Sequence, residues 1–465
     1  MTATTSAIVE PGRNTPVFGE YEVVVLGGGP AGITAAIAAG RAGRSTILVE
    51  RYGFLGGAGT AAGLSTFCGL HANVHGDIRQ VVHGIADDIL ARLEHMGGLN
   101  EAHLSFANKI KAQAYDISAY KIAADELLVG AGVKVLFHVF AVGALKRSEH
   151  EIDTLLIESK SGRAAIRGRM FIDCSGDGDL AAWAGVPYAI GDDAGNMIYP
   201  TTMFRINGVD PLKAGRAWET IPKLMDEAER QGRRFPRKGA IVRPQKNPIE
   251  WRANLTQVKN PDGSAVSGID VEQMSYGEIE GRRQCWEVFE FIRSTTPGFD
   301  RAYIVEIAPQ LGIRATRRVL GEYVLSESDI LECAGFPDSI GVNGWPVEAH
   351  IAGNVSIKFP KIPESRGYNQ MPYRMIVPRG IDNLFVAGRC ASMTHDGQSS
   401  ARVTGPCYVM GQAAGTAADM ALASGVAPRA IDVPGLQQRL AAAGAFLGVA
   451  DASASAVPAV GLSGR

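Results

Sequence analysis

The chain of 465 residues is long enough for two or three domains with sizeable cores. Apolar residues make up 46% and charged residues 20%, which excludes wholesale disorder. The formal net charge of −2 gives no field that would attract nucleic acid or an acidic membrane, so neither is expected as a partner. No stretch has the character of a membrane span, and no secretory signal is expected. Six scattered cysteines without metal-binding spacing indicate reduced thiols, a cytoplasmic location and no metal site.

The first elements of the chain predict a βαβ unit. Residues 21–26 (YEVVVL) and 45–50 (STILVE) are β-branched apolar runs, which fit strands buried on both faces. Residues 31–43 between them are small and apolar, as in a closely packed helix. Strand, helix and strand within thirty residues predict a parallel sheet covered by helices.

The alternation of strands and helices continues along the chain, is interrupted and then resumes. The further elements expected in chain order are Gly-rich loops alternating with helices over 54–115, a helix over 116–130, a strand over 133–137, a hairpin over 141–146 and 154–159, a strand over 165–174 with a short helix ending at 184, a strand over 383–387 and an Ala-rich helix over 404–424. From about residue 190 to 351 prolines, tryptophans and charges rise, and the βα alternation is lost.

These changes predict an α/β fold: a split Rossmann-like nucleotide-binding domain with a central parallel sheet, interrupted by an inserted mixed α+β second domain. The expected segments are a flexible N-terminus (1–18), the first part of the nucleotide-binding domain (19–189), an inserted substrate or interface domain (190–351), the second part of the nucleotide-binding domain (352–447) and a flexible C-terminal tail (448–465).

A glycine-rich turn between the first strand and helix predicts a dinucleotide site. Residues 27–32 (GGGPAG) fit G-x-G-x-x-G: Gly27 allows the tight turn, Gly29 lets backbone approach a pyrophosphate and Gly32 lets the helix pack on the strand. The start of the helix supplies free N–H groups for the phosphates. Glu50 closes the second strand, where an acid accepts hydrogen bonds from ribose hydroxyls. A tight βα turn without a ligand is the alternative.

Two more glycine-rich segments follow. Residues 52–60 (YGFLGGAGT) can run close beside a long ligand, because glycine lacks a Cβ. Residues 176–181 (GDGDLA) fit a second G-x-G-x-x-A pattern and leave a separate NAD site as an alternative. No βαβ unit follows them, and Pro187 and Pro200 interrupt the next segment, so we expect one dinucleotide site.

At these residues the chain resembles the FAD-dependent oxidoreductases with a glutathione-reductase-type FAD domain, and within them a branch with E-R-x-G-x-L-G-G after the second strand. The segments that carry the resemblance are 50–57 (ERYGFLGG), 172–179 (IDCSGDGD), 311–318 (LGIRATRR), 383–389 (NLFVAGR) and 411–415 (GQAAG).

The resemblance implies FAD as the cofactor and a role for each matching residue. Gly27, Gly29 and Gly32 would hold the pyrophosphate, and Glu50 the adenosine ribose. Gly56 and Gly57 would pass beside the ribityl chain, and Gly388 with Arg389 would approach its pyrophosphate end. Gln412 and Ala413 would stabilise negative charge on the reduced ring. The full predicted FAD-binding set is Gly27, Gly29, Pro30, Ala31, Gly32, Glu50, Arg51, Gly56, Gly57, Asp177, Gly388, Arg389, Gly411, Gln412 and Ala413.

Differences between this sequence and those of related flavoenzymes limit the reactions that we expect. Dithiol reductases of this group need a redox cysteine pair after the first Gly-Gly, and here only Cys68 lies nearby, which argues against disulfide exchange. Aromatic hydroxylases usually show Gly-Asp where this chain has Gly388-Arg389, so hydroxylation ranks second.

Two residues near the second FAD strand are the predicted catalytic groups. His395 could take a proton as hydride leaves a carbon next to oxygen or nitrogen, and Arg402 could hold a carboxylate or a flavin oxygen. The alternatives are a loop histidine bonded to backbone, and an ion pair of Arg402 with Asp396.

Further polar residues could face the same cavity. His71 and His75 follow the Gly-rich loop, although each is more often a solvated or capping histidine. Helical spacing would put Arg314 and Arg317 on one face, close to Arg318, where they could bind an anionic substrate or pair with Glu306 and Glu322.

The function expected is oxidation of a small organic substrate by hydride transfer from carbon to flavin, with oxygen or another acceptor reoxidising it. The alternatives are a monooxygenase or reductase that uses external NAD(P)H, an electron-relay subunit, and a flavin-free NAD dehydrogenase. The substrate, the electron acceptor and the oligomeric state, a homo-oligomer included, stay open.

Overall fold

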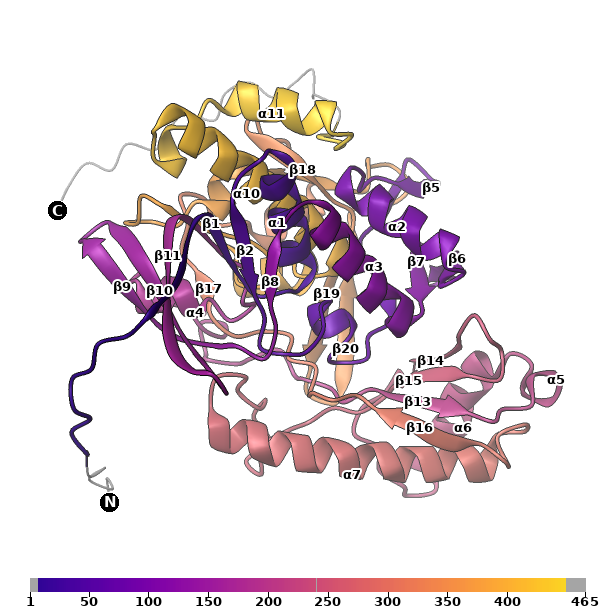
Figure 1. Ribbon diagram of the computed structural model, residues 1–465. Helices are drawn as coiled ribbons and strands as arrows, with labels where there is room; N and C mark the ends of the chain where they lie inside the picture. Colours follow the sequence, from indigo (N-terminus) through magenta and orange to yellow (C-terminus); the bar gives the residue numbers. More distant parts are fainter. Residues whose placement is uncertain (1–6, 240, 449–465) are drawn as a thin grey trace.

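The computed structural model describes residues 7–239 and 241–448; most of the two predicted flexible ends (1–6 and 449–465) lies outside this range. The large unit is built on a seven-stranded sheet in the order β8-β2-β1-β11-β10-β9, with β22 paired to β11 (Figure 1). Its strands are β1 (Val17–Leu26), β2 (Thr46–Val49), β8 (Lys134–Leu136), β9 (Phe140–Ser148), β10 (Glu151–Ser159), β11 (Gly162–Asp173) and β22 (Leu384–Val386).

The parallel part of this sheet confirms the predicted α/β architecture. β8, β2, β1, β11 and β22 run parallel, whereas β10 and β9 form the predicted antiparallel hairpin at the edge. The apolar run Val23–Val25 is fully buried, and α1 packs on β1 and β2. The helices of this unit are α1 (Pro30–Arg41), α2 (Ile85–His95), α3 (Ile117–Gly130), α4 (Asp179–Trp183), α8 (Glu327–Leu331), α9 (His395–Ala401), α10 (Thr404–Ser424) and α11 (Val433–Ala442).

The strand register brings four chain segments to one edge of the sheet. Leu26 pairs with Val49 on one side and with Asp173 on the other, and Asp173 pairs with Val386. The carboxyl ends of β1, β2, β11 and β22 are therefore level. In open α/β sheets ligands bind beyond this edge, so the loops that leave these four strands define where a site is expected.

A second layer lies below the large unit in Figure 1. It is an antiparallel sheet in the order β14-β15-β13-β16, covered by the long helix α7, with its own core around Trp251 and Phe289. Its elements are β13 (Phe204–Asn207), α5 (Pro211–Ala214), α6 (Ala217–Arg230), β14 (Ile241–Pro244), β15 (Trp251–Asn254), α7 (Val271–Thr295) and β16 (Tyr303–Ile307).

The chain rejoins the core of the large unit soon after β16. Val319, Leu325 and Val342 belong to that core, although they precede residue 351. At the other end, β1 begins at Val17, inside the segment expected to be a flexible N-terminus. The domain boundaries at 189, 351 and 447 stay predictions.

Short strands replace most of the helices expected over 54–115, where α2 is the one α-helix. This part of the sequence forms hairpins because its polar and apolar residues alternate, as in β7 (IKAQAY). The short strands of this segment are β3 (Thr66–Phe67), β4 (His71–Val74), β5 (Asp77–Gln80), β6 (Leu99–Ser105) and β7 (Ile110–Tyr115). Further short strands, later in the chain, are β12 (Tyr188–Ala189), β17 (Arg318–Val319), β18 (Ser339–Asn343), β19 (Val347–Ile351), β20 (Asn354–Lys358) and β21 (Asn369–Pro372). Across residues 7–239 and 241–448, no helix is both long and apolar enough to cross a membrane.

Candidate active site

A long cavity lies at the carboxyl edge of the parallel sheet. Its walls are the loops that follow β1, β2, β11 and β22, the first turn of α10, and the segment that returns from the second layer. The residues that line it are Gly27, Gly29, Pro30, Ala31, Glu50, Arg51, Tyr52, Gly57, Ala58, Gly59, Ala61, Ala62, Leu64, Cys174, Ser175, Gly176, Gln310, Leu311, Ile313, Gly388, Arg389, Arg402, Val403, Thr404 and Cys407.

The β1–α1 loop forms one wall. Gly29 precedes α1 without a side-chain cap, so N–H groups of the first turn are free to bind phosphate oxygens. Gly32 faces away from the cavity: a Cβ there would stand 1.8 Å from the carbonyl oxygen of Gly27, so glycine is needed for helix and strand to approach.

Glu50 closes the end of the cavity beside this loop. Its Oε2 accepts the N–H of Gly28 at 2.7 Å, and its Oε1 accepts the N–H of Tyr52 at 2.9 Å. Burial raises the pKa of Glu50, and these two donors oppose that shift. The carboxylate is therefore fixed at the place where the sequence predicts the adenosine ribose.

The Gly-rich loop after β2 forms the facing wall. Gly57 has φ +54°, and a Cβ there would stand 2.9 Å from the Cα of Gly29, so the two loops approach as only glycines allow. Gly56 has φ +109° and lies one residue behind the lining. Gly388 lines the opposite side, close to Ala31.

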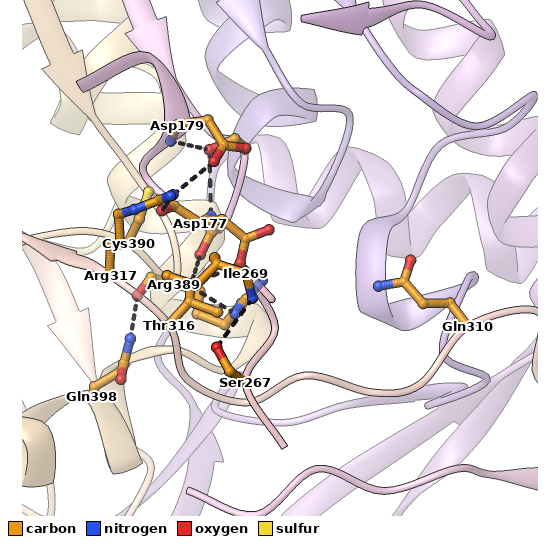
Figure 2. A network of polar contacts seen from close by, with 12 residues as sticks. Asp177, Asp179, Ser267, Ile269, Gln310, Thr316, Arg317, Arg389, Cys390 and Gln398 are labelled. Carbon is orange, nitrogen blue, oxygen red and sulfur yellow. Dashed lines mark hydrogen bonds and ion pairs between the residues drawn. The ribbon is translucent and has the colours of Figure 1, made fainter. Parts of the chain in front are cut away.

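Arg389 lines the middle of the cavity and is fixed by Asp177. Oδ1 of Asp177 accepts Nη2 of Arg389 at 2.8 Å and the hydroxyl of Thr316 at 2.8 Å. Figure 2 shows this network, with Gln310 standing apart from it on another segment. Asp177 itself is absent from the lining, so the structure places it behind Arg389 as a positioning residue.

Arg402 also lines the cavity. Its Nε and Nη2 are buried and have no hydrogen-bond partner. The expected alternative, an ion pair with Asp396, is wrong, because Asp396 accepts Nδ1 of His395 at 2.9 Å. The guanidinium group is thus available to a ligand in the cavity.

The structure does not bring His395 to this cavity. It is the first residue of α9, it is absent from the lining, and its Nε2 is buried without a partner. The predicted proton-accepting role of His395 is therefore unsupported by its position.

The residues of α10 that were predicted to contact FAD lie further along the helix than the residues that line the cavity. α10 begins at Thr404, and its first turn lines the cavity. Gly411 packs on α1, where a Cβ would stand 2.0 Å from the carbonyl oxygen of Ala31. Oε1 of Gln412 accepts the N–H of Ile85 at 3.0 Å. Gln412 and its neighbour Ala413 are buried in that interface, away from the cavity lining.

The other polar candidates also have different positions from those expected. His71 is buried in β4 and His75 binds the carbonyl of Glu364, and neither lines the cavity.

The arginine pattern over 314–318 does not form a helix. Arg314, Arg317 and Arg318 donate to the carbonyls of Tyr199, Asp177 and Met393, respectively. Neither Glu306 nor Glu322 is the partner of any of them; Glu306 accepts from Arg205 instead.

Comparison with known proteins decides the family. Residues 22–440 match the family described as FAD dependent oxidoreductase. This chain belongs to the FAD-dependent oxidoreductases. A 45-residue segment, 10% of the chain, is 55% identical to dihydrolipoyl dehydrogenase of Trypanosoma brucei brucei and spans 9% of that enzyme.

Solved structures similar to this oxidoreductase include a geranylgeranyl bacteriochlorophyll reductase-like protein from Thermoplasma acidophilum, at 15% identity over 91% of this chain and 82% of that one, with a TM-score of 0.47. Another is p-nitrophenol 4-monooxygenase from Pseudomonas putida, at 12% identity over 94% of this chain and 91% of that one, with a TM-score of 0.44.

The cavity of the oxidoreductase fits its cofactor. FAD needs donors for a pyrophosphate, an acceptor for a ribose and an approach free of side chains between them. The start of α1, the carboxylate of Glu50 and the Gly29–Gly57 contact meet these three needs in one cavity.

Several residues of the oxidoreductase escape prediction from its sequence. Gln310, Leu311 and Ile313 line the cavity from the second layer. Glu348 and His350 on β19 lie within electrostatic reach of Arg402. The one sequence pattern that includes some of these residues is the segment 311–318. That pattern indicates family membership and does not predict contact with the cavity.

Proposed function

We propose that this FAD-dependent oxidoreductase oxidises a small organic substrate at a C–H bond next to oxygen or nitrogen. FAD supplies the hydride acceptor when bound, and oxygen or another acceptor takes up the electrons. The observation that carries the proposal is one cavity lined both by Glu50 and by the unpartnered guanidinium of Arg402. It offers a polar anchor beyond the dinucleotide cradle.

Residues that line the cavity can bind and orient such a substrate. Arg402 supplies donors for a polar group, while Leu311 and Ile313 supply apolar side chains. Nη2 of Arg51 donates to Oε1 of Gln310 at 3.2 Å, which ties the second layer to the dinucleotide cradle.

The thiols support this chemistry over disulfide exchange. All six cysteines are free, and Cys68 is the one that follows the Gly-rich loop. Burial raises the pKa of Cys68 to about 12, so its thiol is protonated and a poor nucleophile at neutral pH.

Anaerobic reduction of the FAD-loaded protein tests the proposal. Alcohols, amines, 2-hydroxy acids and 2-amino acids are added in turn, and the main visible flavin band is followed. We expect one of these classes to bleach the band without a nicotinamide. Arg402→Met should lose this bleaching while dithionite still reduces its flavin. Bleaching by reduced nicotinamide alone would support a reductase or monooxygenase, and bleaching by dithionite alone would support an electron-relay subunit.

A further inference from the structure

Three arginines from separate parts of the chain lie close together, and one of them, Arg402, lines the cavity. Arg237 precedes β14, Arg314 lies between β16 and β17, and Arg402 follows α9. Arg237 is 1% and Arg314 8% exposed. The charge of Arg314 interacts with those of both Arg237 and Arg402. We call these three residues the arginine cluster.

Internal partners leave donors of Arg237 and Arg402 unsatisfied. Arg314 donates through Nη1 to the carbonyl of Tyr199 at 2.8 Å. Arg237 donates to the carbonyl of Asn254 at 2.7 Å and contacts His350, but its Nε is buried without a partner. Nε and Nη2 of Arg402 are likewise buried and unpartnered. Buried charged donors without acceptors are costly, so such a cluster indicates a ligand.

The charges around the arginine cluster do not balance. Glu348 is the carboxylate that acts on all three arginines. It also accepts Nε1 of Trp345 at 3.0 Å and contacts Nε2 of His350 at 3.3 Å.

The remaining neighbours do not supply the missing negative charge. Burial and the charge of Arg314 lower the pKa of His350 to about 3, so His350 is neutral. Arg389 lies near Arg402 and is already paired with Asp177. Three buried guanidinium groups therefore face one carboxylate.

The geometry points to a carboxylate-bearing substrate, whose carboxylate is bound by Arg402, with the charge of Arg314 close behind it. This inference rests on the proposed function and names its substrate class. The planar guanidinium fork matches a carboxylate with two parallel hydrogen bonds. Arg402 lines the cavity, and so do Leu311 and Ile313 beside Arg314. A carboxylate bound there lies in the same cavity as the dinucleotide cradle and supplies the missing negative charge.

Binding of carboxylates paired with neutral isosteres tests the inference. FAD-loaded protein is titrated with propionate and benzoate, and in parallel with propionamide, benzamide and inorganic phosphate. The readouts are intrinsic tryptophan fluorescence, because Trp345 is bonded to Glu348, and the unfolding temperature. We expect saturable responses to the carboxylates and none to the amides. Equal responses to both, or a response to phosphate alone, would overturn the inference.

Variants locate the binding site. Arg402→Met should weaken carboxylate binding roughly tenfold to a hundredfold, the loss of a charge-assisted hydrogen bond, and Arg402→Lys should retain part of it. Arg374→Met is the matched control, because Arg374 pairs with Asp338 outside the cavity. Unchanged affinity in Arg402→Met would overturn the inference. If that variant does not fold, the fall in affinity expected of Arg402→Lys makes the same test.

The two proposals fail in different ways. If carboxylates bind but no compound bleaches the flavin, the proposed oxidation fails and the carboxylate site stands. If alcohols or amines bleach the flavin as well as their carboxylate counterparts do, the proposed oxidation stands and the carboxylate site fails.

Discussion

The backbone N–H of Gly28 donates a 2.7 Å hydrogen bond to Oε2 of Glu50, which ties the β1–α1 loop to the end of β2. Two chain segments of the dinucleotide cradle thus share one carboxylate. Because the same carboxylate faces the cavity, it connects the local structure of the loop with cofactor binding.

We predict that substitution of Glu50 weakens FAD binding in two steps. Glu50→Gln keeps an acceptor but loses the charge, and Glu50→Ala loses both oxygens. The loss of a charged hydrogen bond costs about 1.5–3 kcal/mol, roughly tenfold to a hundredfold in the dissociation constant, with the larger effect in Glu50→Ala. Fluorescence titration of the apoprotein with FAD measures this. Unchanged affinity in Glu50→Ala would remove Glu50 from the site.

Gly57→Ala is predicted to abolish FAD binding beyond its effect on stability. Gly57 has φ +54° and a Cβ there meets Gly29, whereas Gly43 has φ +83° with open space around it. Both alanines cost about 1–2 kcal/mol of stability through the left-handed backbone. Only Gly57→Ala should also lose affinity for FAD. Urea unfolding and FAD titration of the two variants separate strain from cofactor contact, and equal FAD affinity in both would contradict the close approach.

The pair Arg389–Asp177 is predicted to stabilise the protein more than a surface pair does. The side chains are 19% and 9% exposed, so Arg389→Met leaves a buried carboxylate unpaired at a cost of about 3 kcal/mol. Arg429 pairs with Asp382 near the surface, and Arg429→Met should cost less than about 1 kcal/mol. Urea unfolding of both variants gives the comparison. A cost below 1 kcal/mol for Arg389→Met would show that Asp177 does not position Arg389.

Acid should destabilise the protein through His71. Burial lowers the pKa of His71 to about 4 in the folded state, against 6.5 when unfolded. The unfolded state then binds the extra proton, so the stabilisation is complete above pH 6.5 and is lost as the pH falls toward 4. At about pH 5 the loss is roughly 2 kcal/mol. His71→Gln should lose less stability than the native protein between about pH 7 and pH 5 in urea unfolding. Parallel curves would place the acid sensitivity elsewhere.

Local patterns explain why the βαβ unit could be predicted. Val23–Val25 are β-branched residues, which favour strands, and they are fully buried. The turn after them needs a positive φ at Gly27, which glycine adopts readily. The segment around Arg314 could not be predicted this way. Arginines three residues apart satisfy helical spacing, but here each binds a carbonyl on a distant segment, so tertiary contacts override the local pattern.

The candidate site divides in the same way. Gly29, Glu50 and Gly57 were predictable, because cofactor loops have a fixed spacing from the strands that they follow. Arg402 and Arg314 were also among the candidates, because their charge suits an anion, whereas Arg237 was not, because it comes close to them only through packing of the second layer. Gln412 shows a third case: the helix is correct, but the residue lies too far from its N-terminus to line the cavity.

A crystal structure of the FAD-loaded protein with bound benzoate tests the account most directly. The account predicts the adenosine ribose beside Glu50, the pyrophosphate at the start of α1, and the benzoate carboxylate on the guanidinium of Arg402. FAD density outside the Gly29–Gly57 contact would contradict the cofactor site. Benzoate bound away from Arg402 would contradict the substrate class.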